Sequence, residues 1–297
     1  MTIYVPGKVT LAKEFTWNES VWNPSMLSTA LWLDAADAST ITESGGAITA
    51  WADKSGNGHN AAANGNPTYS ATGMSTSKPA VQLDGTGDAL VSSITGIGSF
   101  DALDVYMVTQ TLTAAQSNTN SGFFWAFGNV ANASGSYPGN RSLNSTSSTG
   151  VLNGEFINFG LENSSFSAGR LGSSTYRRAA NTAQILNTKH STSDTSLFAN
   201  GSQVNLGLAA QITTSTNTAP SNVGYAVDSD LHFGAIRVGG SLIYSPAIKF
   251  AEIVVSSTLL STSNRQKLEG YLAQKWGLTA DLPNDHPYRW MPPTPGA

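Results

Sequence analysis

The chain of 297 residues contains no cysteine, which excludes disulfide bonds, thiolate zinc sites and cysteine nucleophiles together. Charged residues are also scarce, at 11%, where an ordinary soluble domain has about 25%. The polar surface must therefore come from Ser, Thr, Asn and Gly, which suit strands and turns better than long helices. The net charge of -4 gives no basic footprint, so we expect neither nucleic acid nor an anionic membrane as a partner.

Long hydrophobic runs are missing as well. No stretch approaches the ~20 apolar residues of a membrane span, and the start, MTIYVPGKVTLAKEF, lacks the basic beginning and continuous apolar core of a secretory signal. We therefore expect a soluble protein made in a cytoplasm, with no signal peptide and no transmembrane segment. Hydrophobic residues still make up 40% of the chain, which is enough to bury a substantial core.

Short apolar runs separated by Gly, Asn, Ser and Pro dominate from Leu31 onward. Many short strands with turn signals between them are typical of an all-β sandwich or barrel. The expected strands cover residues 30–34, 48–53, 80–83, 104–112, 122–127, 155–159, 183–189, 195–199, 231–238 and 248–255. Three segments without apolar periodicity are expected to be long loops, at residues 114–120, 131–150 and 213–224.

One helix is predicted near the C-terminus. Ser261 can cap its start, and Gly277 ends it. Between them, one apolar stripe forms at helical spacing and should pack on the sandwich. Its members are Leu268, Tyr271, Leu272 and Trp276.

The two ends of the chain differ in sequence pattern from the domain that we predict at residues 26–280. Residues 1–25 are expected to form an extended arm, and residues 281–297 a Pro-rich tail lying across the surface. Two exposed Trp in a free arm would be costly. Trp17 and Trp22 are therefore expected to pack on the same domain or to bind a neighbouring subunit, with a first strand of the sandwich as the alternative for the arm.

Several motifs resemble the opening and closing segments of concanavalin A-like lectin/glucanase domains of the LamG type. They span most of residues 27–290, and the resemblance implies a two-sheet antiparallel jelly-roll sandwich with one C-terminal-region helix. The motifs are LWLDAAD at 31–37, WADKSGNG at 51–58, KPAVQLDG at 78–85, LFANG at 197–201, FAEIVV at 250–255 and NRQKLEGYLAQKWG at 264–277.

The arm with Trp-Asn-Pro-Ser at 22–25 is most similar to proteins of tailed-bacteriophage particles. This resemblance implies a non-enzymatic virion structural protein, a capsid decoration or tail-associated module, present in many copies and bound to other virion proteins. The alternative is a carbohydrate-binding or receptor-binding lectin module that takes glycans.

Catalytic motifs of this fold are not found in the sequence. A retaining glycosidase needs two carboxylates about 5–5.5 Å apart, and the Glu-x-Asp-x-x-Glu spacing of the glucanase branch is absent. The nearest substitute, Asp228-Ser229-Asp230, is explained by a turn or solvent contact. There is no Gly-x-Ser-x-Gly elbow, and the four His show no metal-type spacing. We therefore expect no enzyme.

Two binding sites remain as hypotheses. Asp53 and Asn57 in Asp-Lys-Ser-Gly-Asn-Gly offer oxygen ligands for calcium, but with one local carboxylate an Asx-type turn is the favoured explanation. Tyr137, beside Pro138 in a predicted loop, is a candidate platform for stacking a sugar ring. Trp125 lies in a run so apolar that we expect it in the core.

Overall fold

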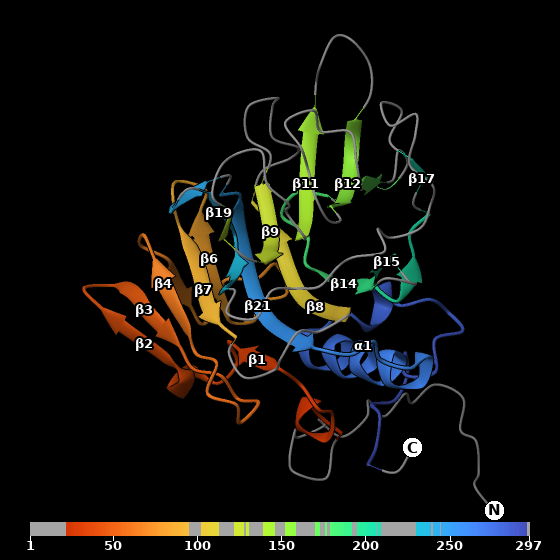
Figure 1. The fold of residues 1–297 in the computed structure, drawn as a ribbon. Helices are drawn as coiled ribbons and strands as arrows, with labels where there is room; N and C mark the ends of the chain where they lie inside the picture. Colours follow the sequence, from red (N-terminus) through yellow and green to blue (C-terminus); the bar gives the residue numbers. More distant parts are fainter. Residues whose placement is uncertain are drawn as a thin grey trace, which may run out of the picture.

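A computed structural model describes residues 22–94, 102–112, 122–127, 129–130, 139–145, 152–158, 170–172, 176, 179–191, 195–205, 207–208, 230–238, 240–243 and 245–295. In this part of the chain, two large antiparallel sheets are packed together with one α-helix (Figure 1). The predicted all-β, two-sheet sandwich with one helix near the C-terminus is confirmed.

The first sheet has eight strands in the order β16-β15-β14-β8-β21-β6-β5, and β1 pairs with β21 outside this order. Its centre is the long antiparallel pair of β8 and β21. Its strands are β1 (Leu31–Asp34), β5 (Thr68–Ser70), β6 (Ala80–Asp84), β8 (Ala102–Thr111), β14 (Gln184–Ser191), β15 (Thr195–Ala199), β16 (Ser202–Gln203) and β21 (Ala247–Ser256).

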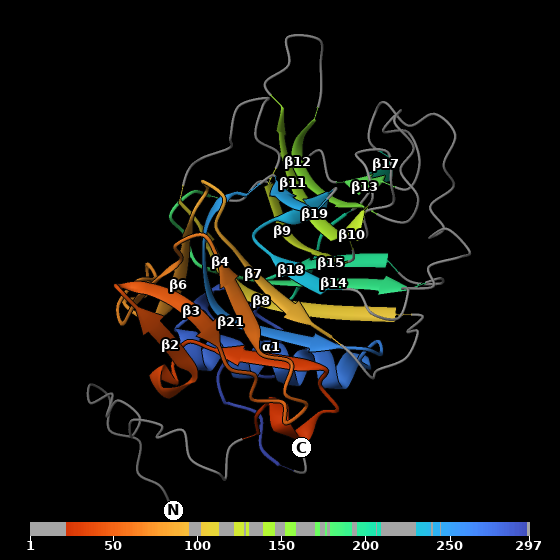
Figure 2. The same ribbon diagram turned by 60° about the vertical axis from the view of Figure 1, so that its left-hand side comes forward.

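The second sheet has ten strands in the order β17-β13-β12-β11-β9-β18-β7-β4-β3-β2. Figure 2 shows it in front of the first sheet. Its strands are β2 (Ile41–Ser44), β3 (Ala47–Trp51), β4 (Ala61–Asn64), β7 (Ala89–Ser93), β9 (Gly122–Phe127), β11 (Gly139–Ser145), β12 (Leu152–Asn158), β13 (Arg170–Gly172), β17 (Gly207–Leu208) and β18 (Asp230–Phe233).

The loop predicted at residues 131–150 is wrong in part, because β11 occupies its middle and pairs with both β9 and β12. Its sequence, GNRSLNS, has little apolar content, so hydrophobic periodicity could not reveal it. The loops predicted at 114–120 and 213–224 lie outside the described residues.

The strand predicted at residues 231–238 is broken in two by Gly234. This glycine has a φ of +81°, and a Cβ there would lie 2.0 Å from Cδ2 of Leu83, so a side chain is excluded both by the backbone and by packing. The chain turns after β18 and continues as β19 (Ile236–Val238), which leaves the ten-stranded sheet. With β10 (Asn129–Val130) and β20 (Ser241–Ile243), β19 forms a small separate sheet.

Alternate side chains of each strand fill the space between the two large sheets. Leu31 and Leu33 of β1 are fully buried there, and Phe233 of β18 meets Phe250 of β21 edge to face at 6.3 Å between ring centroids. Trp125 is also fully buried, which confirms that it belongs to the core. Burying such side chains contributes about 1.5–3 kcal/mol each.

Helix α1 (Thr262–Trp276) forms a third layer on the outer side of the eight-stranded sheet (Figures 1 and 2). Ser261 caps it by accepting the N–H of Asn264, and Gly277 ends it in the left-handed conformation, both as predicted. Trp32 of β1 points away from Leu31 and Leu33, and the helix layer buries it. The alternation of side chains along β1 thus places a packed layer on each side of the strand.

A buried ionic network joins this helix to the sheet. Lys275 of α1 binds Asp34 of β1 at 2.6 Å and Glu252 of β21 at 2.8 Å. Lys54 binds the other oxygen of Asp34 at 2.9 Å. Burial alone would raise the pKa of Asp34, but Lys275 and Lys54 outweigh it and hold that pKa below the ordinary value. Burial prevails at Glu252, whose pKa is raised despite Lys275.

Both ends of the described chain are part of the packed body. Trp22 is buried against the ring of Tyr271 of α1, and its N–H donates to the carbonyl of Pro293 at 3.3 Å. On the C-terminal side, His286 is buried beside Glu269 of α1. Packing therefore extends beyond residues 26 and 280 in both directions, through η1 (Pro24–Met26) and past η3 (Thr279–Asp281).

Candidate ligand-binding face

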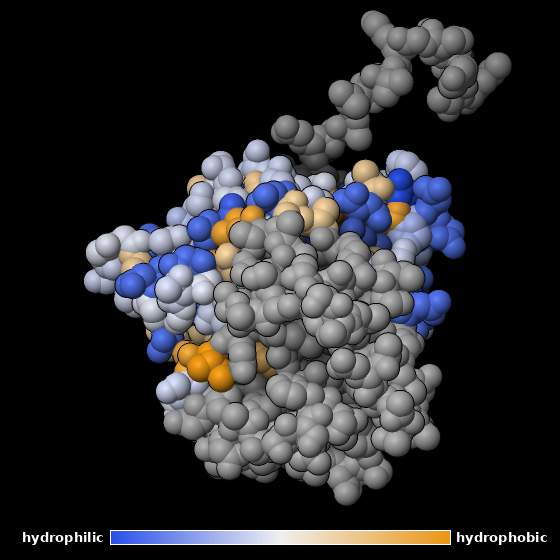
Figure 3. All heavy atoms as spheres, turned by 90° about the horizontal axis from the view of Figure 1, so that it is seen from above, coloured by the Kyte–Doolittle hydropathy of each residue, from blue (hydrophilic) through white to orange (hydrophobic). Residues whose placement is uncertain are grey.

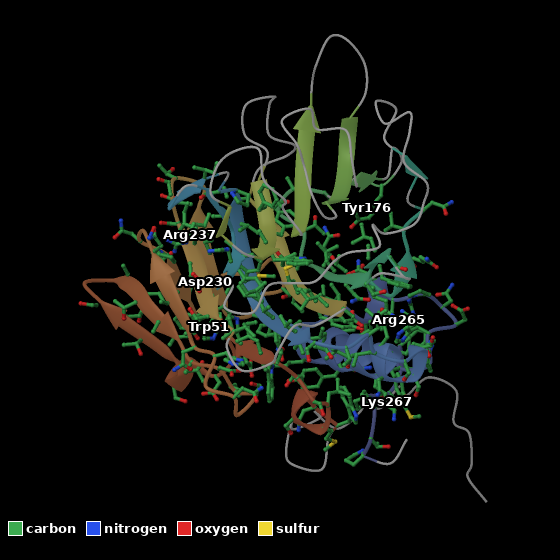
Figure 4. The ribbon with its side chains drawn as sticks, in the orientation of Figure 1. Trp51, Tyr176, Asp230, Arg237, Arg265 and Lys267 are labelled. Atoms are coloured by element: carbon green, nitrogen blue, oxygen red, sulfur yellow. The ribbon has the colours of Figure 1, made fainter. Side chains whose placement is uncertain are left out.

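The outer face of the ten-stranded sheet carries a group of ionisable side chains. Because side chains alternate along a strand, and Leu231 and Phe233 of β18 are in the core, Asp230 and His232 point to the outer face. The break at Gly234 then brings Arg237 of β19 back over β18, where its Nε–H donates to Nε2 of His232 at 3.4 Å. Figure 4 shows Asp230 and Arg237 near each other on this side of the molecule.

His232 is neutral at this position. It is fully buried, and burial, which outweighs the opposing charge of Asp230, lowers its pKa to about 4. Since Nε2 accepts from Arg237, the single proton of the neutral ring must lie on Nδ1. The Ala126 carbonyl lies near enough to favour the charged ring, yet among the described residues Nδ1 has no hydrogen-bond partner.

Asp230 and Ser93 complete this group at the surface. The Ser93 hydroxyl donates to Oδ1 of Asp230 at 2.6 Å, across the antiparallel pairing of β7 and β18. Ser93 is exposed, and Asp230 and Arg237 are half-buried. A carboxylate, a guanidinium and a hydroxyl from three strands therefore reach one face, above the buried ring of His232. We call Ser93, Asp230, His232 and Arg237 the outer-face cluster.

Seen from above, the described surface is mostly hydrophilic, with small hydrophobic groups between (Figure 3). This matches a chain whose polarity comes from hydroxyls and amides rather than from charge. Against such a background, the outer-face cluster is a local concentration of charged groups.

Asp53, predicted as a calcium ligand, is the acceptor at the centre of its own loop. Its two oxygens accept the N–H groups of Trp32, Ser55 and His59 at 2.8–3.0 Å, and the Ser55 hydroxyl at 2.6 Å. Asn57 donates its amide to the carbonyl of Thr29 at 2.8 Å. These are the bonds that the Asx-turn alternative requires, and they tie the loop to β1. Calcium binding itself remains a prediction.

The remaining predicted site residues are Trp22, Trp17 and Tyr137, and the structure describes only the first of them. Trp22 lies in the protein's own core, so its ring is not exposed to a partner. Trp17 and Tyr137 lie outside the described residues, and their predicted roles stay predictions.

Sequence reasoning noticed Asp230 only as half of an isolated carboxylate pair, and it missed His232 and Arg237 as site residues. The alternation in Asp230-Leu231-His232-Phe233 was a usable signal, since it sends the two polar residues to one face. The return of Arg237 depends on the turn at Gly234, which the sequence pattern did not show.

No family model and no curated protein matches the chain. Solved structures do match. The binding domain of botulinum neurotoxin DC, in complex with rat synaptotagmin II, is 11% identical over 82% of this chain and 52% of its own, with a TM-score of 0.51. A Trypanosoma rangeli sialidase mutant displaying trans-sialidase activity is 11% identical over 84% of this chain and 33% of its own, with a TM-score of 0.53.

Trypanosoma rangeli sialidase in complex with sialic acid is 12% identical over 82% of this chain and 33% of its own, with a TM-score of 0.50. The chain thus spans about half of the neurotoxin structure and about a third of each sialidase. At these identities the likeness establishes the fold, a β-sandwich shared with these proteins. Among the described residues, no helix is long and apolar enough to cross a membrane.

Proposed function

We propose that the protein is a non-catalytic binding module that recognises a glycan at the outer-face cluster. The observation that carries this proposal is the convergence of Ser93, Asp230 and Arg237, from three strands, on one face of the sheet, where they offer a hydroxyl, a carboxylate and a guanidinium to a ligand.

The chemistry above His232 suits sugar hydroxyls. The Asp230 carboxylate accepts hydrogen bonds and the Arg237 guanidinium donates them in a fixed plane, so together they can hold neighbouring hydroxyl groups. Ser93 adds a hydroxyl that both donates and accepts. The fold likeness is in keeping with this reading, since one of the similar structures is a sialidase in complex with sialic acid.

Two features support a non-catalytic role. The paired-carboxylate spacing of the glucanase branch is absent from the sequence. Asp34 and Glu252, whose carboxylates share Lys275, are both buried and serve to dock α1, so they are not available to a substrate.

A glycan array probed with the labelled full-length protein tests the proposal. Arg237→Ala and Asp230→Asn should each weaken binding to the same glycans about tenfold or more, because each removes a charge-assisted hydrogen bond. Lys267→Ala is the matched control: it also removes one positive charge, but from α1, away from the cluster in Figure 4. Absence of binding to any glycan, or binding that neither variant changes, would refute the proposal.

The same array with a calcium chelator tests the Asp53 loop. Binding that is lost on chelation and restored by calcium would support the predicted site at Asp53 and Asn57. A turnover assay on β-glucans and sialosides should show no hydrolysis, and activity abolished by Asp230→Asn would overturn the non-catalytic assignment.

A structural protein of a bacteriophage particle is the second candidate. It is favoured by the edge strands β2 and β5, which end the described part of each sheet and carry mostly exposed side chains. Exposed edges can accept a strand from a neighbouring subunit. Co-sedimentation with a purified phage particle, together with the molar mass in solution, tests this role. A monomer that binds no particle would exclude it.

A further inference from the structure

Three large hydrophobic side chains of the described residues are exposed to solvent, and two of them are neighbours in the C-terminal segment. They are Trp290, 78% exposed, Met291, 71% exposed, and Met26, 44% exposed. Single exposed hydrophobics are ordinary, but these three belong to two segments that touch each other, because the N–H of Trp22 donates to the carbonyl of Pro293. Both segments lie below α1 in Figure 1. We call Trp290 and Met291 the terminal patch.

The segment that displays Trp290 is firmly attached to α1. Gln274 donates its side-chain amide to the carbonyls of Tyr288 at 3.1 Å and Arg289 at 3.3 Å. Tyr288 packs so closely on Gly270 that a Cβ there would lie 2.2 Å from the Tyr288 Cβ. Trp290 therefore projects from a fixed backbone rather than from a loose tail, and docking on it costs little ordering entropy.

Residues 1–21 are joined covalently to Trp22, whose backbone N–H is bonded to Pro293, three residues from Trp290. A chain of 21 residues can reach about 70 Å when extended, so the patch is well within its range. The segment carries apolar side chains of its own, and covalent attachment gives it a high effective concentration at this place. These side chains include Ile3, Tyr4, Val5, Val9, Leu11, Phe15 and Trp17.

We propose that the terminal patch is the docking surface for residues 1–21 of the same chain, with Phe15 and Trp17 as the side chains that cover Trp290 and Met291. The contact removes apolar surface from water on both partners. It also gives Trp17 the role of packing on its own domain. This inference is independent of glycan binding at the outer-face cluster, which lies on a different sheet.

Hydroxyl-radical footprinting of the full-length protein, read by mass spectrometry, tests the contact. Oxidation of Met291 and Trp290 should be slow in the native protein and several-fold faster in a Phe15→Ser/Trp17→Ser variant, because oxidation follows exposure. Thr16→Ser is the matched control in the same segment and should behave like the native protein. Met74 and Met107, both buried, stay protected in every variant that is folded.

The reciprocal variant, Trp290→Ser/Met291→Ser, should accelerate the oxidation of Trp17. Equal rates for Met291 and Trp290 in native and Phe15→Ser/Trp17→Ser protein would overturn the proposal. Protection that disappears on dilution would also overturn it, since the covering segment would then come from a second copy.

Discussion

Trp276 donates its indole N–H to Oε2 of Glu252 at 2.6 Å, which bonds the last turn of α1 to the middle of β21. The other carboxylate oxygen, Oε1, accepts the indole N–H of Trp32 at 2.7 Å. One buried acid thus joins the first strand, the last strand and the helix. The motifs behind the family resemblance meet at this carboxylate, so they specify the docking of three elements rather than a binding site.

Glu252→Ala should therefore destabilise the protein by about 3–5 kcal/mol, the usual cost of breaking a buried ion pair from one side. Two indole donors lose their acceptor, and Lys275 keeps Asp34 and the Tyr271 hydroxyl as partners. Urea unfolding at neutral pH measures the change. Glu43→Ala, on the exposed edge strand β2, is the control and should alter stability by no more than about 0.5 kcal/mol. A loss below 1 kcal/mol in Glu252→Ala would show that the network contributes little.

Asp104 gives stability a dependence on pH. Burial, only partly offset by the N–H of Leu260 and by Asn187, raises its pKa from 3.8 to about 6. The folded protein therefore binds this proton more tightly than the unfolded chain, and its contribution to stability falls as pH rises from about 4 to 6. Relative to Asp104→Asn, the native protein should lose about 3 kcal/mol across that window. Unfolding free energies that run parallel in the two proteins would contradict this.

His232 acts in the opposite direction over nearly the same range. Its pKa falls from 6.5 to about 4 on burial, so the stability it contributes is fully present above the unfolded value and is lost as pH drops toward the folded value. Against His232→Gln, the native protein should lose about 3 kcal/mol on acidification. Because Asp104 and His232 offset each other, the native protein should show a flatter profile than either variant. A steeper native profile would count against both assignments.

Gly270→Ala tests the attachment of the C-terminal segment. In an exposed helix this change gains up to about 1 kcal/mol, but here the new methyl would lie 2.2 Å from Cβ of Tyr288, and overpacking costs about 1–3 kcal/mol. We expect net destabilisation in urea unfolding and faster proteolysis after residue 282. Tyr288→Gly in the same chain removes the clash, so the double variant should recover part of the loss. A Gly270→Ala protein as stable as the native one would mean that the segment shifts freely.

Much of the fold could be predicted because it follows from local patterns. Ser261, the apolar stripe and Gly277 fixed the helix, and the alternation in Leu31-Trp32-Leu33-Asp34 required a layer on each side of β1. The strands that were missed, such as β11 in GNRSLNS, have too little apolar content for periodicity to register.

The candidate site was less predictable because it depends on tertiary contacts. Arg237 reaches His232 through the turn at Gly234, where a side chain would collide with Leu83, 151 positions earlier in the chain. Asp53 was ambiguous for a different reason. Its carboxylate oxygens can bind a calcium ion or accept backbone N–H groups in an Asx-type turn, and the sequence is compatible with both.

The bond between Trp22 and Pro293 means that the polypeptide enters and leaves the domain at one point. A unit with this geometry can be spliced into a surface loop of another protein, or carried at the tip of a stalk, without straining the sandwich. In Figure 4, Arg237 and Asp230 lie far from Lys267 of α1, the helix on which Trp22 packs. The attachment point therefore does not use the face that carries Arg237 and Asp230.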